Sequence, residues 1–423
     1  MPSTKNVPMP RIVELAATVS DSVAKLEQVL SAKGAPWPSF DENAPDSLPK
    51  EATEAQNAVI DAAAELYDLM LDPLTLVYRN SAGYHLTSIQ VIGRYEIAKM
   101  IPAGGQVSYG EIAKQTGLNE HVVRSLLRHA MTLRFFCEPQ PGMVAHTKAS
   151  KLLSRPEINS FMSHNPEIGW PSALKLLDAL QKWPESQEPD ETAFSLANNN
   201  EGSVYEVFTR YPEKALRFAA GMKTFGVLPG FGLSCAVDGY DWAALGRAHI
   251  VDVGGSQGSM AVALAKRFPE LSLVVQDMPD VVEGGDATLP SELRGRISFM
   301  AHDFFKPQTV RADAYLLRTI LHNWSDKYCF LILRALVPAL KHGARILIND
   351  ICLSAPGSVP AHLEYDMRCH DLGMRALFNS QERDLQEWKA LLAAADRRFV
   401  FQGISQVPRS ALAVIEAIWD ENA

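Results

Sequence analysis

The sequence predicts two domains: an α-helical domain with a winged helix, then an α/β domain with a mostly parallel seven-stranded sheet and an antiparallel closing strand. Three observations support this. At 423 residues the chain is too long for one ordinary core. After Gly246, short apolar runs alternate with helical stretches, which is typical of a parallel sheet. Between Gln106 and Ala149, two short helices and a hairpin follow one another.

Composition and charge restrict the class of protein. Hydrophobic residues make up 47% and charged residues 21%, as in a soluble globular protein. A net charge of −9 disfavours binding to nucleic acid or to an anionic membrane. The five cysteines lie far apart and are odd in number, which is typical of reduced thiols. Because no signal core, membrane span or lipidation signal is recognisable, we expect a cytoplasmic protein without a membrane partner.

Apolar residues in steps of three and four predict an amphipathic helix over residues 12–30, which Gly34 ends. A loop rich in Pro, Ser and Asp covers 35–49, and helical periodicity returns over 51–71. The first helix precedes any core of its own. We therefore expect it to pack on a second subunit in a homodimer; the alternative is that it folds back on its own domain.

The pattern after Gln106 is that of a winged helix. Ser108 and Asn119 are suited to cap two successive helices. Two extended pieces, 135–138 and 143–146, are joined by a proline-containing turn. A DNA-binding role is one interpretation, but acidic residues offset much of the positive charge and the whole chain is acidic. We expect a scaffold or dimerisation role and no nucleic-acid partner.

We place the domain boundary so that residues 1–195 form the helical domain and 196–423 the α/β domain. An acidic, proline-rich stretch over 183–192 is expected to be a surface connection. Seven runs of the second domain have the length and apolar content of strands, and the last two form an antiparallel pair. They lie near 249–253, 271–276, 297–301, 312–317, 344–349, 399–405 and 410–418.

A glycine turn follows the first predicted strand. Gly254 and Gly255 separate Ile250–Val253 from a helix-forming stretch, so backbone N–H groups and a positive helix end face a ligand. The spacing of a dinucleotide fingerprint is absent. Asp252, just before the glycines, would repel a pyrophosphate but attract the ammonium of an amino acid. This favours S-adenosyl-L-methionine (SAM); the alternative is an ordinary βαβ unit with capping aspartates.

Polar residues follow the predicted strands at their carboxyl ends, where an open α/β sheet binds its ligand. Asp277, at the end of the second strand, suits the two ribose hydroxyls of SAM. The other polar or aromatic residues at strand ends are Asp303, Phe304, Arg318 and Asp350.

His322 follows the fourth strand and is a candidate general base. A single histidine is more often structural. Two carboxylates on later segments favour catalysis: Asp350 ends the fifth predicted strand, and Glu382 lies within 379–383. Either could hold the imidazole in its useful tautomer and stabilise the imidazolium.

Residues from about 192 to 419 resemble the SAM-dependent O-methyltransferases of the plant caffeate/flavonoid type, and above all the fungal members acting on aromatic polyketides. The resemblance rests on Val251–Gly255, on Leu321–Asp326, and on Asp371–Met374 with Glu382-Arg383 following. It implies a Rossmann-like class I methyltransferase domain. The N-terminal half is more loosely similar to the family's winged-helix dimerisation domain.

The resemblance implies SAM as cofactor, S-adenosyl-L-homocysteine (SAH) as product and no metal. It implies that His322 is the base, flanked by Asp350 and Glu382. The residues implied to bind SAM are Asp252, Gly254, Gly255, Gly258, Asp277, Met278, Asp303, Phe304 and Arg318. Those implied to line the acceptor pocket are His146, Phe218, Met222, Asp371 and Met374, with His146 entering from the other domain or subunit.

Two residues depart from the family pattern. Ser256 stands where a third glycine is usual, and its side chain would hinder close approach of the backbone to the methionine part of SAM. Asp350 replaces the commoner glutamate and is one methylene shorter, so it reaches an imidazole nitrogen only if the backbone shifts slightly.

The expected reaction is methyl transfer from SAM to a phenolic hydroxyl of an aromatic, polyketide-like secondary metabolite. The alternative on the same fold is a pericyclase that uses the sulfonium as a fixed charge. A disturbed base would favour that alternative, and here His322 and both acids are intact. A third possibility is a catalytically inactive partner or regulatory protein.

Overall fold

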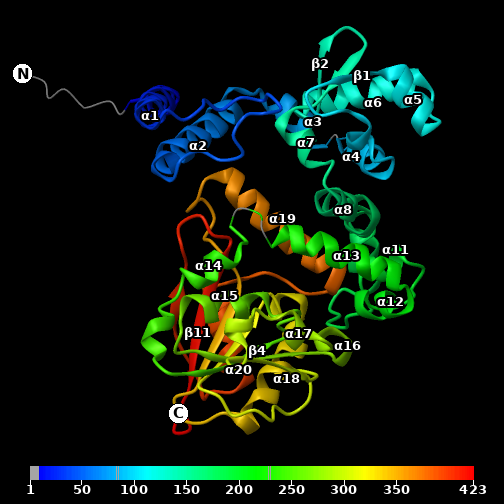
Figure 1. The fold of residues 1–423 in the computed structure, drawn as a ribbon. Coiled ribbons are helices and arrows are strands. Elements are labelled where there is room, and N and C mark those ends of the chain that lie inside the picture. The colour runs from blue at the N-terminus through cyan, green and yellow to red at the C-terminus, as the bar shows by residue number, and fades with distance from the viewer. Residues whose placement is uncertain (1–8, 82, 84, 227, 229) are drawn as a thin grey trace, which may run out of the picture. The chain divides into compact units, whose positions relative to one another are not determined.

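The computed structural model describes residues 9–423 except 82, 84, 227 and 229. The chain divides into two compact units (Figure 1). The first comprises Met1–Pro166 with Gly357–Glu364, and the second comprises Glu167–Pro356 with Tyr365–Ala423. No helix among the described residues is both long and apolar enough to cross a membrane.

The first unit begins with two helices packed on each other, α1 (Arg11–Lys33) and α2 (Thr53–Met70). Gly34 ends α1 in the left-handed conformation, as predicted. Leu26 and Leu30 of α1 are buried with Ala52 and Ala55. The helices predicted over 12–30 and 51–71 are therefore confirmed. Two shorter helices follow, α3 (Pro73–Ser81) and α4 (His85–Arg94).

The predicted winged helix is present. The side chains of Ser108 and Asn119 each accept a backbone N–H at a helix start, as N-caps do. A three-stranded antiparallel sheet in the order β1-β3-β2 completes the motif. Its elements are β1 (Gln106–Ser108), α5 (Tyr109–Thr116), α6 (Glu120–Thr132), β2 (Cys137–Gln140) and β3 (Met143–Ala145), followed by α7 (Lys148–Leu152) and α8 (Pro156–His164).

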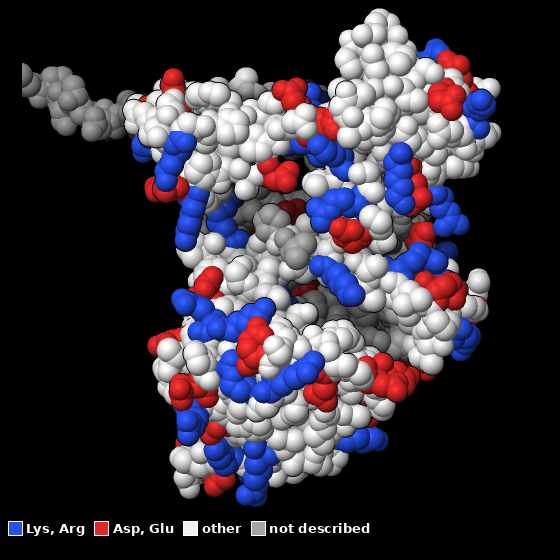
Figure 2. Space-filling view, viewed as in Figure 1, with Lys and Arg blue, Asp and Glu red and all other residues white. Residues whose placement is uncertain are grey.

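Two arginines of α6 are paired with acids of the same unit. Arg124 lies 2.6 Å from Glu120, and Arg128 lies 2.8 Å from Glu138. On the face shown in Figure 2, positive and negative side chains are interspersed. The charge that these two arginines would offer to a phosphate is therefore neutralised.

The second unit begins earlier than the boundary that we expected, because residues 167–195 pack in it. Ala179 and Ala193 are buried together with Ala376 of α19 (Ala361–Phe378). Helical periodicity shows that a helix has an apolar face, but not which domain core that face packs against. The sequence therefore did not show to which domain these helices belong. They are α9 (Trp170–Leu174), α10 (Leu176–Lys182) and α11 (Ala193–Ala197), followed by α12 (Val204–Arg210), α13 (Pro212–Phe225) and α14 (Leu233–Val237).

The large sheet runs in the order β10-β11-β8-β7-β4-β5-β6, with β11 antiparallel to its two neighbours and the other neighbouring pairs parallel. This confirms the predicted seven-stranded, mostly parallel sheet. A further short strand, β9 (Arg383–Asp384), pairs with β8. The other strands are β4 (His249–Val253), β5 (Ser272–Asp277), β6 (Ile297–Ala301), β7 (Ala314–Arg318), β8 (Arg345–Leu353), β10 (Phe399–Ser405) and β11 (Leu412–Trp419).

Helices cover both faces of this sheet (Figure 1). One face is packed by α18 (Asp326–Leu336) and α20 (Leu385–Ala395), around Trp388. The other is packed by α14 and α15 (Ser259–Arg267), around Trp242. Two short helices, α16 (Pro279–Val282) and α17 (Gly285–Thr288), follow β5. Because β4, β5, β7 and β8 are parallel, their carboxyl ends meet at one edge of the sheet.

Candidate active site

The turn after β4 leaves no room for side chains at its glycines. Gly254 has a φ of +69°, and a Cβ there would lie 2.5 Å from Ile320 Cδ1. A Cβ at Gly255 would lie 2.6 Å from the carboxyl group of Asp252. Gly254 has a backbone conformation that other residues rarely adopt, and a side chain at Gly255 would displace the Asp252 carboxyl group, so glycine is favoured at both positions of this turn.

Ser256 adopts the left-handed conformation that favours glycine, with a φ of 50°. Its N–H donates to Asp277 Oδ2 at 2.8 Å, which helps to hold the turn in this shape. Gly258, with a φ of +73°, begins α15, and a Cβ there would lie 2.9 Å from the ring of Phe299. The departure from glycine at Ser256 is thus accommodated by a hydrogen bond between the ends of β4 and β5.

Asp252 and Arg318 carry buried atoms with unused hydrogen-bonding capacity. Burial raises the pKa of Asp252 to about 7, although the charge of Arg318 opposes this. Arg318 donates to the carbonyl of Phe231 at 2.8 Å. Within the described residues, Asp252 Oδ2 and Arg318 Nε have no hydrogen-bond partner. Because unpartnered buried polar atoms are costly, a ligand that carries both an ammonium and a carboxylate fits this pair.

The ends of β5 and β6 bring further predicted residues to the same edge. Asp277 Oδ1 accepts the N–H of Met278 at 2.8 Å. Asp303 Oδ1 accepts the N–H of Phe305 at 2.9 Å, which fixes the turn that carries Phe304. Since β4, β5 and β6 are neighbours, the residues expected to bind ribose and adenine follow adjacent strands.

His322 lies in a one-turn 3₁₀ helix, Leu321–Asn323, directly after β7. Its Nδ1 lies 3.0 Å from Glu382 Oε1, and its backbone N–H donates to Asp350 Oδ2 at 3.3 Å. Burial lowers the pKa of the ring, but the charges of Glu382 and Asp350 outweigh burial and raise the pKa to about 9. Because Glu382 engages Nδ1, Nε2 is the nitrogen that can receive a proton from an acceptor.

The two carboxylates therefore have different contacts. Glu382 holds the imidazole, whereas Asp350 binds the backbone of His322 rather than its ring. Asp350 also lies inside β8 and does not end it, because β8 continues to Leu353 by pairing with β11 and β9. The parallel pairing of β8 with β7 ends at Asn349, so Asp350 is the first residue of β8 beyond that pairing. Burial raises the pKa of Asp350 to about 6.

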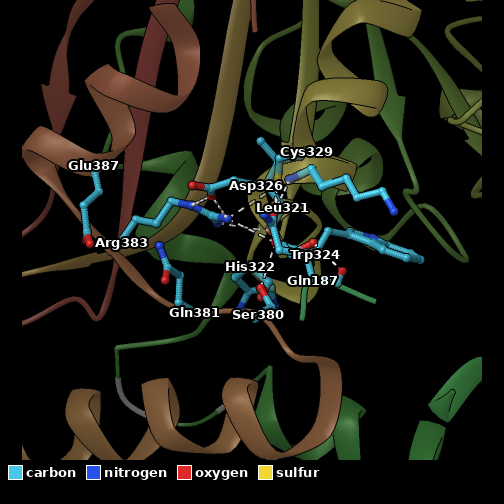
Figure 3. A network of polar contacts seen from close by, with 12 residues as sticks. Gln187, Leu321, His322, Trp324, Asp326, Cys329, Ser380, Gln381, Arg383 and Glu387 are labelled. Carbon is cyan, nitrogen blue, oxygen red and sulfur yellow. Dashed lines mark hydrogen bonds and ion pairs between the residues drawn. The ribbon is translucent and has the colours of Figure 1, made fainter. Parts of the chain in front are cut away.

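Arg383, which follows Glu382 in the chain, is tied to the segment that follows His322 (Figure 3). Its side chain is 1% exposed and donates to Asp326 Oδ1 at 2.6 Å and to the carbonyl of Trp324 at 3.1 Å. Ser380 Oγ lies 2.5 and 2.8 Å from the carbonyl oxygens of His322 and Trp324, which share its one O–H donor. These hydrogen bonds hold the loop after β7 against the turn that precedes β9.

Helices α13 and α19 carry the other four residues expected to line the acceptor pocket. Asp371 Oδ1 accepts the N–H of Glu382 at 2.9 Å, so it lies beside the residue that contacts His322. The rings of Phe208 and Phe218 have centroids 4.9 Å apart, and Met374 packs in the same apolar cluster as Phe208. Met222 lies one turn after Phe218 on α13 and is half-buried.

His146 belongs to the first unit, whereas the other four candidates belong to the second. It is buried in the first unit, where its Nδ1 lies 3.0 Å from Ser150 Oγ and its Nε2 lies 3.2 Å from the carbonyl of Ile101. Both ring nitrogens are therefore engaged inside the winged helix. We omit His146 from the acceptor site proposed below, because its contacts are those of a structural histidine.

Sequence reasoning did not single out Tyr205 on α12. Its ring stacks on Trp324, with centroids 5.4 Å apart and planes at 12°. Tyr205 thus packs against the segment that follows His322. No motif marks it, because an aromatic residue in a short helix is more often a core residue.

A parallel sheet with one antiparallel strand, a glycine turn after its first parallel strand and acids at the first two strand ends define the SAM-dependent methyltransferase class. Residues 178–397 match the family described as O-methyltransferase domain. The chain is 46% identical over 413 residues to O-methyltransferase PaMT of Phomopsis amygdali, with 97% of each protein covered. The protein therefore belongs to the fungal SAM-dependent O-methyltransferases.

Two further comparisons extend this result. The chain is 36% identical to chlorophenol O-methyltransferase of Trichoderma longibrachiatum, over 97% of this chain and 91% of that one. It also resembles the solved structure of LepI in complex with SAM, with a TM-score of 0.73, 24% identity, and coverage of 95% of this chain and 99% of that one. The second comparison shows the shared fold.

Proposed function

We propose that this enzyme methylates a phenolic hydroxyl of an aromatic secondary metabolite, with His322 as the general base. The observation that carries the proposal is the 3.0 Å contact between His322 Nδ1 and Glu382 Oε1 at the ligand-binding edge of the sheet. The apolar residues Phe218, Met222 and Met374 would suit an aromatic ring. A relative named for chlorophenol supports a phenolic acceptor.

The environment of His322 fits proton removal from a phenol. A phenol has a pKa of about 10 and an ordinary histidine one of about 6.5, so proton transfer would be unfavourable by roughly 5 kcal/mol. With a pKa of about 9, His322 reduces this difference to about 1 kcal/mol. Glu382 orients the ring so that Nε2 takes the proton, and the imidazolium that forms is stabilised by its charge.

The residues at the strand ends fit the parts of SAM. Asp252 and Arg318 would hold its ammonium and carboxylate, Asp277 the ribose hydroxyls, and Asp303 with Phe304 the adenine. When bound, SAM supplies the methyl group on a sulfonium. In the part of the chain that the structure describes, no group of three or more His, Cys, Asp or Glu side chains is arranged to hold a metal ion.

Replacing Asp277 with alanine should weaken SAH binding by about 1–3 kcal/mol, because buried ribose hydroxyls would lose their acceptor. Titration calorimetry with SAH measures this directly. Asp280→Ala is the matched control, since it removes an equally charged, exposed side chain three residues further on. Equal SAH affinity in the Asp277 variant and the control would contradict the placement of the ribose.

We further propose that the enzyme is a homodimer in which α1 is buried. In the single chain one side of α1 packs on α2, but Val13 and Val23 are 48% and 43% exposed. On α3, which follows α2 in the chain, Leu74, Val77 and Tyr78 are 77%, 65% and 70% exposed. Exposed apolar side chains in such number on α1 and α3 are typical of an interface between subunits.

Deleting residues 1–34 should therefore give a monomer or an aggregate in size-exclusion chromatography, because the partner surface of α1 would be uncovered. Val23→Glu is the gentler test: it places a charge on the exposed side of α1 and leaves Leu26 and Leu30 packed. Retention of an active dimer by both variants would contradict the proposed interface.

Incubation with SAM and a panel of phenolic aromatic compounds tests the proposed function. The expected outcome is a product heavier by one methyl group, formed together with an equal amount of SAH. Conversion of a substrate without SAH formation would instead favour the pericyclase alternative. Failure to convert any compound, together with weak SAM binding, would favour the inactive partner.

A further inference from the structure

Residues 186–188, between α10 and α11, contact the segment that follows His322. Ser325 Oγ donates to the carbonyl of Gln187 at 2.8 Å, and Lys327 N–H donates to Gln187 Oε1 at 2.9 Å (Figure 3 labels Gln187). Tyr328 donates from its hydroxyl to Glu188 Oε2 at 2.8 Å. The stretch predicted to be a plain surface connection is therefore anchored to the start of α18.

These contacts replace an ordinary helix cap. The first N–H groups of a helix have no acceptor within it, and a serine at the position of Ser325 usually supplies one. The side chain of Ser325 makes no such cap. Gln187, 140 residues from Lys327 in the chain, accepts the Lys327 N–H instead. The start of α18, and with it the loop of His322, is thus tied to a distant segment.

The same three residues hold the turn that carries Glu382. Asn379 Nδ2 donates to the carbonyls of Ser186 and Glu188 at 2.8 and 3.2 Å. Asn379 is 7% exposed and has a φ of 54°, so it is fixed in a tight turn. The next residue, Ser380, donates to the carbonyl of His322. Residues 186–188 therefore lie between the two segments that carry the base and its partner carboxylate.

We propose that residues 186–188 act as a strap that positions His322 against Glu382, and that Asn379 is the positioning residue through which the strap acts. The inference rests on the proposed function of His322. Asn379 need not touch the acceptor or SAM. Its amide fixes the position of the turn before β9 relative to the loop after β7. An error of about 1 Å in such a pair is enough to lower a rate by roughly 10²-fold.

Asn379→Gly is the sharpest test, because glycine accepts the left-handed φ. The change removes the side-chain amide with its hydrogen bonds to residues 186 and 188 and a 3.4 Å contact with Arg375. We expect kcat to fall about tenfold and SAH affinity to stay the same. The pKa of His322, followed by NMR of labelled histidine, should fall, because a looser contact with Glu382 stabilises the imidazolium less. If the pKa of His322 falls, the midpoint of the pH–activity profile should move to lower pH.

The other titratable or charged groups facing His322 are Asp350 on β8, Arg383 on β9 and His370 on α19. Burial lowers the pKa of His370, which favours its neutral form. Arg383 is anchored independently to Asp326, and Asp350 lies within its own strand. A shift of the turn at Asn379 therefore acts mainly through the contact between His322 and Glu382.

Two further variants keep the test decisive. Tyr328→Phe removes one anchor of the strap without changing packing, and should lower the pKa of His322 by a smaller amount. Arg334→Ala is the matched control: it removes hydrogen bonds of 2.7 and 3.1 Å at the other end of α18. It should leave the pKa of His322 unchanged.

An unchanged pKa of His322 in both Asn379→Gly and Tyr328→Phe would overturn the strap. So would the same pKa shift in Arg334→Ala, because the effect would then be general destabilisation. Absence of methyl transfer by the unaltered enzyme would overturn the proposed function alone, since the titration of His322 is measured without turnover.

Discussion

Replacing His322 with alanine is expected to lower kcat for methyl transfer by roughly 10²- to 10⁴-fold, the usual contribution of a general base. SAH affinity should change little, because the residues proposed to bind SAM follow other strands or, like Arg318, precede the loop of His322. The measurement is steady-state methylation of the best phenolic acceptor, with SAH affinity from calorimetry.

His249→Ala is the matched control for this variant. His249 starts β4, at the other end of the strands, with its Nδ1 3.0 Å from Ser272 Oγ. It should retain nearly full activity. Methylation at the unaltered rate by the His322 variant would remove this residue from the mechanism, and an equal loss in both variants would point to damaged folding.

Replacing Glu382 with glutamine should give the second largest effect, a loss in kcat of roughly 10²-fold. A neutral amide stabilises the imidazolium less, and it can also donate to Nδ1 and so favour the wrong tautomer. Asp350→Asn should cost less than about tenfold, because the asparagine oxygen can still accept the backbone N–H of His322.

The pH profile separates the two carboxylates further. His322 must be neutral to accept a proton, so activity should rise with pH and reach half its maximum near 9, the raised pKa of the ring. Removing the charge of Glu382 lowers this pKa and should move the rise to lower pH. An unmoved profile in Glu382→Gln would show that another group limits the reaction.

The strands and the ends at which ligands bind were predictable from the sequence. Strands β4 and β7 are buried on both faces, so each appears as a continuous apolar run, and glycines or polar residues mark where each ends. The candidates Asp252, Asp277 and His322 follow from these ends. The full length of β8 was not predictable, because pairing with β9 and β11 continues this strand past Asp350.

Contacts between distant segments could not be predicted. Which carboxylate holds the imidazole depends on a few ångströms of backbone position, and spacing along the chain does not encode that. Gln187 and Asn379 lie in polar stretches without periodicity, and their hydrogen bonds join segments about 140 and 190 residues apart. His146 was placed by resemblance alone, and its two hydrogen bonds inside the winged helix carry no signal in the sequence.

The most direct test of the central claim follows the methyl group itself. The enzyme and its His322→Ala variant are incubated with SAM labelled on the methyl carbon and with the best acceptor, at SAM concentrations that saturate both. We predict that the label appears on the phenolic oxygen of the product, in an amount equal to the SAH formed, and that the variant loses this transfer. Product that forms while the label stays in SAM, at equal rates in both proteins, would contradict His322-dependent methyl transfer.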